Sequence, residues 1–211
     1  MTLSSDVASP PSRYPPGVPP STLRETVLQA AVDYIADHGP DRLSFRQVAA
    51  AAGVSHQAPY HHFGDRRAIF EAIALDGFTM LNDALLRAAK PEDTESAALA
   101  MGERYIEFAL SHRGHFRVMF RSDLCHVAES AELQAAADAA FETLVDQARR
   151  VVGDEATPDE VKVQATMMWA LAHGLATLLV DGSLDRHVGS VRRRRALVHS
   201  VLLGSGLCSR H

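Results

Sequence analysis

The stretch LSFRQVAAAAGVSHQAPYHHF, residues 43–63, decides the fold of this chain. It holds two short segments that fit helices, residues 44–51 and 55–62, separated by Ala52-Gly53-Val54. Ser44, followed three residues later by Gln47, matches a helix capping box, and Ser55 offers a cap for the second helix. Gly53 suits the left-handed backbone of a short turn. The stretch therefore predicts a helix-turn-helix.

Helical periodicity continues on both sides of this stretch. Apolar residues recur at spacings of three and four, without sustained period-two alternation. A first helix is expected from about residue 23 to His38-Gly39-Pro40, where glycine suits a helix end and proline prevents continuation. Further helices are expected at about 65–89 with Asp65 as cap, at 94–111 with Thr94 as cap, and at 129–152, 159–180 and 188–203, with a capping box at Thr157. We therefore predict an all-α fold.

Composition and charge describe a soluble globular protein. The 211 residues include 21 Lys and Arg against 26 Asp and Glu, a net charge of -5, and are 46% hydrophobic. We see neither a secretory leader nor an uninterrupted apolar run of about 18 residues, and the two cysteines form no CxxC pair. A cytoplasmic protein without a membrane partner is expected. The acidic balance disfavours indiscriminate nucleic-acid binding, yet residues 21–67 are neutral, with 5 basic and 5 acidic groups.

Four segments carry a resemblance to a known family. Residues 26–31, 43–49, 52–55 and 60–70 resemble, in register over about 50 residues, the N-terminal domain of the TetR family of transcriptional regulators. Residues 169–174 (WALAHG), preceded by 116–120 (FRVMF), resemble a TetR C-terminal domain type named for its Trp and His-Gly. The resemblance implies three regions: a disordered Pro-rich arm at 1–20, a three-helix DNA-binding domain at 21–67, and a helical bundle at 68–211 for ligand binding and dimerisation.

The resemblance also implies a mechanism. A homodimer would place two recognition helices in successive major grooves, about 34–36 Å apart, on a roughly palindromic double-stranded operator. Most members are repressors, released when a small-molecule inducer occupies the C-terminal bundle and shifts the helix at 65–89. The sequence names neither the inducer, the operator and the regulated genes nor the direction of control. We expect dimerisation through the last two helices, where Ala165, Ala172, Gly174 and Ala176 permit close packing beside aliphatic residues.

The recognition segment supplies the expected DNA contacts. We expect His56 to donate a hydrogen bond to guanine, Gln57 to form a bidentate pair with adenine, and the Ala58 methyl to contact a thymine methyl. Candidate phosphate contacts are Ser44, Arg46, Gln47, Ser55, Tyr60, His61 and Arg66. The open alternative is that His56 or Gln57 contacts only phosphate or water. Protonation of His56, His61 and His62 is expected to strengthen operator binding as the pH falls toward about 6.

Aromatic and sulfur-containing residues of the C-terminal region form a candidate ligand pocket. The set is Tyr105, Phe116, Met119, Phe120, Phe141, Trp169 and His173. His173 follows Trp169 by four residues, so both lie on one helix face and His173 offers a polar contact. The alternatives are an ordinary helical core, with His173 as a hydrogen-bonded core histidine or as part of the dimer face.

Enzymatic and metal chemistry have little support. The sequence shows no phosphate loop, nucleophile elbow, paired Glu-x-x-His or HExxH motif, so no catalysis and no cofactor are expected. His61 and His62 point about 100° apart on a helix, so no metal site is expected there. Whether His112, His115, Cys125 and His126 bind anything is left open, since their spacing matches no recognised site. The rival interpretation is a helical metal-binding or interaction protein that carries a helix-turn-helix without operator function.

Overall fold

The regular elements of this protein are all helical. The computed structural model describes residues 23–90 and 93–207, and it contains no strand in that part of the chain. The α-helices are α1 Leu23–His38, α2 Phe45–Ala52, α3 Ala58–Phe63, α4 Arg66–Ala88, α5 Thr94–Ser111, α6 Arg113–Met119, α7 Ala131–Val152, α8 Pro158–Val180, α9 Asp185–Val188 and α10 Val191–Gly204. Two 3₁₀ turns, η1 Pro40–Arg42 and η2 Val127–Glu129, complete the set. The all-α prediction is confirmed; the arm expected at residues 1–20 lies outside the described residues.

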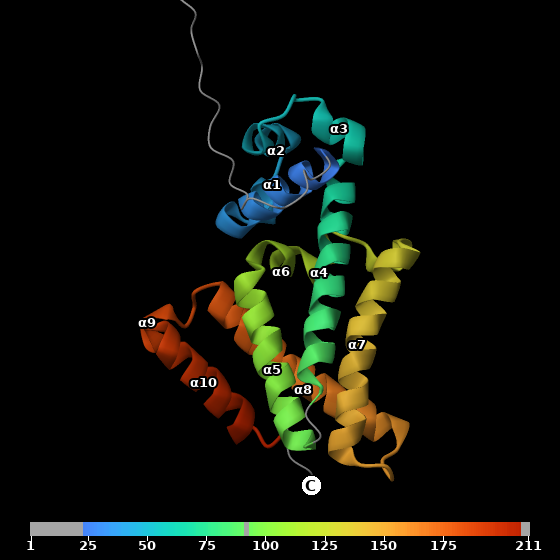
Figure 1. The fold of residues 1–211 in the computed structure, drawn as a ribbon, viewed down its shortest axis with the longest axis vertical. Helices are drawn as coiled ribbons and strands as arrows, with labels where there is room; N and C mark the ends of the chain where they lie inside the picture. Colours follow the sequence, from blue (N-terminus) through green and yellow to red (C-terminus); the bar gives the residue numbers. More distant parts are fainter. Residues whose placement is uncertain (1–22, 91–92, 208–211) are drawn as a thin grey trace, which may run out of the picture.

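The helices form two groups joined by one long helix. Helices α1, α2 and α3 lie at one end of the molecule, and α5, α7, α8, α9 and α10 lie at the other (Figure 1). Helix α4 runs from the first group into the second, with α5 and α7 beside it. Helix α6 is wedged between α1 and α4 and contacts both.

Side-chain caps define several helix starts. Asp65 caps α4 by accepting a hydrogen bond from the Ala68 amide at 2.9 Å, and Thr157 forms a full capping box with Glu160 at the start of α8. The expected cap of α5 was wrong by one residue: Asp93 accepts from the Ser96 amide at 2.7 Å, and Thr94 is the first helical residue. A carboxylate at this position also interacts favourably with the positive end of the helix dipole.

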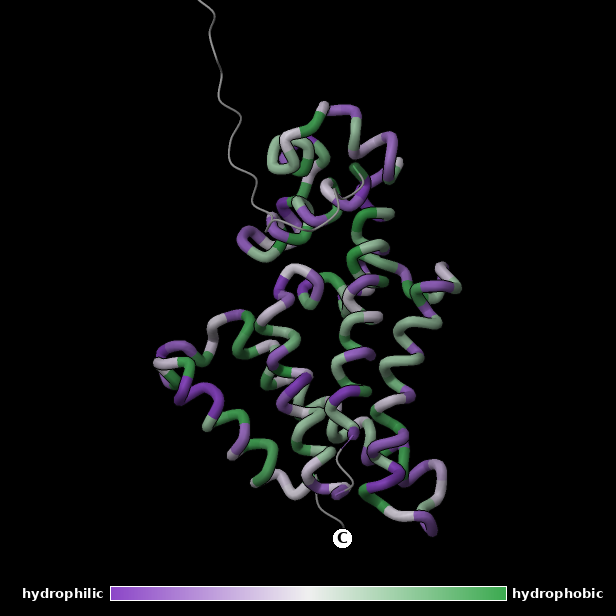
Figure 2. Tube along the Cα trace, viewed as in Figure 1, coloured by the Kyte–Doolittle hydropathy of each residue, from purple (hydrophilic) through white to green (hydrophobic). Residues whose placement is uncertain are grey.

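The apolar core is continuous from one group of helices to the other. On α4, Ile69, Phe70 and Ile73 are buried near the end that adjoins α1 and α3, and Phe78 and Leu81 are buried farther along. All five belong to one cluster that also includes residues of α1, α2, α5, α6, α7, α8 and α10. The hydropathy map shows mainly hydrophobic positions along α4 and α8, whereas α10 alternates between hydrophilic and hydrophobic residues (Figure 2). Helix α4 is therefore the shared wall of both halves.

Helix α8 keeps an apolar face outside this core. Among the described helices it alone is long and apolar enough, by length and composition, to cross a membrane, although 44% of its most apolar stretch is buried in the protein. One set of its exposed residues is small or apolar: Val163, Met167, Ala170, Gly174 and Leu178. Their spacing of three and four residues places them on a single helix face.

Candidate DNA-reading surface and ligand cavity

The helix-turn-helix forms where the sequence predicts it. Ser44 Oγ accepts a hydrogen bond from the Gln47 amide at 3.4 Å and donates to Gln47 Oε1 at 2.7 Å. Gly53 ends α2 with φ of 67°, a left-handed conformation that favours glycine. Its amide bonds the carbonyl of Ala50, and the Val54 amide bonds the carbonyl of Ala49. These bonds satisfy the end of α2 and turn the chain toward α3.

The recognition helix begins later than expected. Ser55 does not cap it with its side chain; its carbonyl accepts the Ala58 amide at 3.0 Å in a turn that precedes α3. Gln57 stands at the cap position without a side-chain capping bond. Pro59 is the second residue of the helix, where the missing amide hydrogen costs no intrahelical hydrogen bond. The turn leaves His56 and Gln57 exposed ahead of the helix.

Most of the predicted DNA contacts lie on the surface. Exposed members are Ser44, Arg46, Ser55, His56, Gln57, Tyr60, His61 and Arg66, and Gln47 is partly exposed. Ala58 is the exception, because it is only 5% exposed and packs in the interior. Its expected contact with a thymine methyl does not fit this arrangement. Arg66 also has a structural task, since its guanidinium donates to the Leu43 carbonyl at 3.1 Å and joins α4 to the start of the helix-turn-helix.

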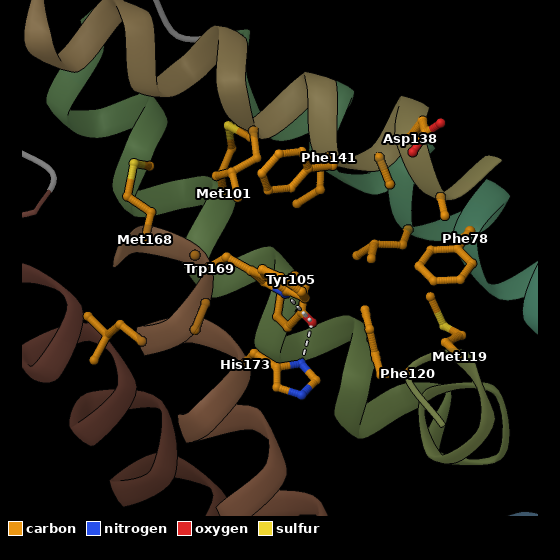
Figure 3. A pocket seen from close by; sticks show the side chains of 18 of the residues that line it. Phe78, Met101, Tyr105, Met119, Phe120, Asp138, Phe141, Met168, Trp169 and His173 are labelled. Carbon is orange, nitrogen blue, oxygen red and sulfur yellow. Dashed lines mark hydrogen bonds between the residues drawn. The ribbon is translucent and has the colours of Figure 1, made fainter. Parts of the chain in front are cut away.

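A cavity of about 870 Å³ lies within the C-terminal group of helices. Helices α4, α5, α6, α7, α8 and α10 and residues 122–129 form its walls. Its apolar lining includes Phe78, Leu81, Met101, Met119, Phe120, Phe141, Leu144, Met168 and Trp169 (Figure 3). The rings of Phe120 and Phe141 lie with centroids 6.1 and 6.0 Å from that of Trp169. The volume and the apolar lining are those of a small-molecule site.

A hydrogen-bonded cluster of three side chains lies within this apolar lining. Tyr105 Oη and His173 Nδ1 are 2.8 Å apart, and Trp169 Nε1 donates to Tyr105 Oη at 3.4 Å (Figure 3). Burial lowers the pKa of His173, which favours the neutral imidazole. Burial also raises the pKa of the Tyr105 phenol, so that group keeps its proton. The cluster therefore presents uncharged hydrogen-bonding groups in the apolar wall.

The structure brings six of the seven predicted pocket residues to the cavity wall: Tyr105, Met119, Phe120, Phe141, Trp169 and His173. Phe116 does not line it. Its ring lies behind the wall, with centroids 5.3 Å from His173 and 5.6 Å from Phe120, and it is 6% exposed. Phe116 thus supports the polar cluster from outside the cavity.

The histidines and cysteine around α6 do not converge on one point. Among residues 23–90 and 93–207, no group of three or more His, Cys, Asp and Glu side chains is arranged to hold a metal ion. His112 bonds the Phe108 carbonyl at 3.2 Å, whereas His126 pairs with Glu129 at 3.0 Å. The Cys125 thiol contacts the Val118 and Arg121 carbonyls at 3.5 Å, and burial raises its pKa to about 11. His115 is buried, which lowers its pKa to about 4 and keeps it neutral.

Comparison with protein families identifies both halves. Residues 27–73 match the family model for bacterial regulatory proteins of the TetR family, and residues 98–201 match the model for tetracyclin repressor-like C-terminal domains. The two matches together cover more than half of the chain and include the helix-turn-helix, Tyr105 and the segment from Trp169 to Gly174. The chain belongs to the TetR family.

Individual relatives agree with this assignment over nearly their full length. The HTH-type transcriptional repressor AcnR of Corynebacterium glutamicum is 27% identical over 187 residues, which are 84% of this chain and 97% of AcnR. A protein of unknown function from Rhodococcus sp. RHA1 has a TM-score of 0.68 and 29% identity over 90% of this chain and 98% of its own. The TetR family regulator PfmR of Thermus thermophilus shares the fold, with a TM-score of 0.66 and 19% identity over 86% and 96% of the two chains.

In this TetR-family protein, α6 joins the cavity to the DNA-binding helices. Met119 lines the cavity at the end of α6 and lies against Gly77 of α4, where an added Cβ would be 2.6 Å from Met119 Sδ. At the other end of α6, an added Cβ at Gly114 would lie 2.3 Å from the Val32 carbonyl oxygen of α1. Arg117 then donates to the Ala36 carbonyl at 3.0 Å, near the end of α1. Two close approaches at glycines, one to the Met119 side chain and one to the α1 backbone, hold α6 between α4 and α1.

A second connection runs along the cavity edge. Glu129 lines the cavity and forms an ion pair with Arg67 in the first turn of α4. Arg67 also pairs with Glu71 at 2.8 Å. Both pairs are exposed, so their net contribution to stability is small. Their position is informative, because they link a wall of the cavity to the first turn of α4, directly after the helix-turn-helix.

Sequence reasoning missed several cavity residues. Phe78 and Leu81 of α4, Met101 of α5 and Met168 of α8 line the cavity, although none was singled out from the sequence. Each fits the apolar pattern of an ordinary core helix, so periodicity alone does not separate them from residues of a filled core. The useful signal is the family resemblance, which places a cavity among these helices.

We expect Gly114→Ala to destabilise the protein by about 1–3 kcal/mol, because the new methyl group meets the α1 backbone rather than a movable side chain. Urea unfolding followed by circular dichroism measures the change. Gly204→Ala is the matched control, since a Cβ there meets nothing within 4 Å and the residue is also helical. Equal stabilities of the two variants would show that the close approach of α6 to α1 is not a constraint.

Proposed function

We propose that this DNA-binding transcriptional regulator is a cytoplasmic repressor, which leaves a palindromic operator when a small molecule fills its cavity. The observation that carries the proposal is the presence, in one TetR-family chain, of an exposed recognition segment packed on α1 and α4 and an apolar cavity walled by α4 and α6. The relative AcnR is named a transcriptional repressor, which supports repression as the direction of control. We retain residues 21–67 as the DNA-binding domain and 68–211 as the ligand and dimer domain, although α4 begins at Arg66.

Base recognition is assigned to the residues just before α3. His56 and Gln57 are exposed, and the rings of His56 and Tyr60 lie 6.2 Å apart. Gln57 is suited to a bidentate pair with adenine, and His56 to donation toward guanine. Arg46, Tyr60 and His61 are proposed to hold the phosphate backbone beside them. Ala58 is not proposed to contact a base, because it is buried.

Dimerisation is assigned to the exposed face of α8. Several small and aliphatic residues expected at the dimer face are instead buried in the protomer: Ala165, Ala172, Leu175, Ala176, Val198 and Leu202. The remaining apolar face, Val163, Met167, Ala170, Gly174 and Leu178, is open to solvent in the single chain. Gly174 has nothing within 4 Å of a Cβ position, so a second helix has room to approach it closely. A symmetric contact between two α8 faces would cover an apolar surface that is costly to leave in water.

The proposed switch uses the two connections described above. A ligand that fills the cavity presses on Met119 of α6 and on Phe78 and Leu81 of α4. Because α6 contacts the α1 backbone at Gly114 and α4 begins beside the helix-turn-helix, either displacement moves the recognition helix. Operator affinity falls if the ligand binds the displaced state more tightly than the operator-bound state. The rival interpretation, a metal-binding or interaction protein without operator function, is not favoured by the family assignment.

Operator binding tests the proposal directly. In fluorescence-anisotropy titrations at moderate salt, the protein should bind DNA from upstream of its own gene at least about 1000-fold more tightly than unrelated DNA. Gln57→Ala should cost about 1–3 kcal/mol on the preferred operator and relax base preference at one position per half-site. Arg46→Ala is the comparison, because loss of a phosphate contact weakens all sequences equally. Equal weakening of every sequence by Gln57→Ala would make Gln57 a backbone contact, and equal affinity of the wild type for both DNAs would exclude operator function.

The dimer face has its own test. Met167→Glu places a charge in the middle of the α8 stripe and should convert the dimer to a monomer in sedimentation-velocity runs. Leu86→Glu is the matched control: Leu86 is 51% exposed, comparable to the 46% of Met167, but lies on α4. If Met167→Glu remains as dimeric as the control, the dimer interface does not include this face of α8.

A further inference from the structure

The cavity lining carries information about the charge of its ligand. Among the described lining residues the only charged side chains are two carboxylates, Glu129 and Asp138, and no lysine or arginine is present. Glu129 is already paired with Arg67 and His126 outside the apolar centre. Asp138 is exposed on α7 and lies apart from Tyr105 and His173, in the upper right of Figure 3.

Burying an unpaired anion in this lining would be costly. A carboxylate or phosphate loses its hydration, and the described wall offers no lysine or arginine to replace it. Neither lining imidazole stands as a free cation, because burial favours the uncharged form of His173 and His126 is paired with Glu129. The Asp138 carboxylate repels an anion further.

The Tyr105–His173 pair suits an oxygen atom that bears no charge. If the Tyr105 hydroxyl donates to His173 Nδ1, the Tyr105 oxygen keeps a lone pair for a ligand donor. If Nδ1–H donates to the Tyr105 oxygen instead, the hydroxyl proton is free for a ligand acceptor. A ligand hydroxyl matches both arrangements, and a carbonyl matches the second. Around this point the rings of Phe120, Phe141 and Trp169 offer faces and edges for an aromatic or polycyclic body.

We propose that the cavity selects uncharged, mainly aromatic or polycyclic molecules with one hydroxyl or carbonyl oxygen placed at the Tyr105–His173 pair, and that it rejects carboxylates of the same size. The proposal rests on the function proposed above for the same cavity and adds the class of ligand. The cavity, at about 870 Å³, is large enough for a body of two or more rings.

Three probes with one shared body test the charge and the oxygen separately. The purified full-length protein is titrated at pH 7.5 with 4-phenylphenol, biphenyl-4-carboxylate and biphenyl. Binding is followed by calorimetry and by the fluorescence of Trp169, which is the single tryptophan of the chain and lines the cavity. 4-Phenylphenol should bind about 5- to 10-fold more tightly than biphenyl, from one added hydrogen bond. It should bind at least about 100-fold more tightly than the carboxylate, from the cost of burying the charge.

Variants assign the selectivity to the polar pair. Tyr105→Phe should reduce the affinity for 4-phenylphenol to that for biphenyl and leave biphenyl unchanged, which also shows that the variant is folded. Tyr34→Phe, on α1 and outside the cavity, should change neither affinity. Arg210 follows Leu207, the last described lining residue, by three positions in the sequence. Arg210→Ala should keep the preference for 4-phenylphenol over the carboxylate, which tests whether this arginine affects the charge selectivity.

The outcomes separate this proposal from the function on which it rests. Carboxylate binding equal to or tighter than phenol binding, an unchanged phenol preference in Tyr105→Phe, or no binding of any probe would overturn the ligand class. Operator affinity is measured by anisotropy in the same samples. If 4-phenylphenol binds as expected and operator affinity does not change, the ligand class stands and ligand-induced release fails.

Discussion

One helix must satisfy two sets of neighbours at once, and the rest of the structure depends on that constraint. Helix α4 contacts α1 and α3 at its beginning, and α5, α6 and α7 farther along. Arg66 ties its first residue to the carbonyl of Leu43, while Phe78 and Leu81 form part of the cavity wall. The helix is continuous over 23 residues, with no loop between its two ends. The DNA-reading end and the cavity wall are therefore parts of one helix, and the proposed switch depends on this continuity.

The small residues of α6 and α4 make this relation tight. At Gly114 and Gly77 the absence of a Cβ lets backbone or sulfur atoms approach to distances that any larger residue would prevent. Interiors packed this closely transmit strain, so the proposed switch uses these contacts to pass a shift at Met119 to α1. The exposed Arg67–Glu129 pair adds a weaker link along the same direction.

Sequence reasoning predicted the features that depend on local chemistry. The helix-turn-helix follows from Ser44, Gly53 and the spacing around them, and the shared face of Trp169 and His173 follows from helical periodicity. Features that depend on packing were not predictable in this way. The burial of Ala58 accompanies a turn that delays the start of α3, and the position of Phe116 behind the cavity wall depends on the packing of its ring against Tyr105 of α5 and His173 of α8. Likewise, periodicity indicated that α8 has small and apolar residues but not which of them the protomer itself would bury.

Filling the cavity is proposed to change the separation of the two DNA-reading helices of a dimer. Spin labels at Ala51→Cys, an exposed position near the end of α2, report this separation by pulsed electron resonance in a Cys208→Ser background that leaves only the buried Cys125. With operator bound, we expect one narrow distance distribution. When a compound whose binding changes the Trp169 fluorescence is added, we expect a distribution shifted by several ångströms and loss of the operator. Identical distributions with and without bound compound would show that filling the cavity does not move the DNA-reading helices.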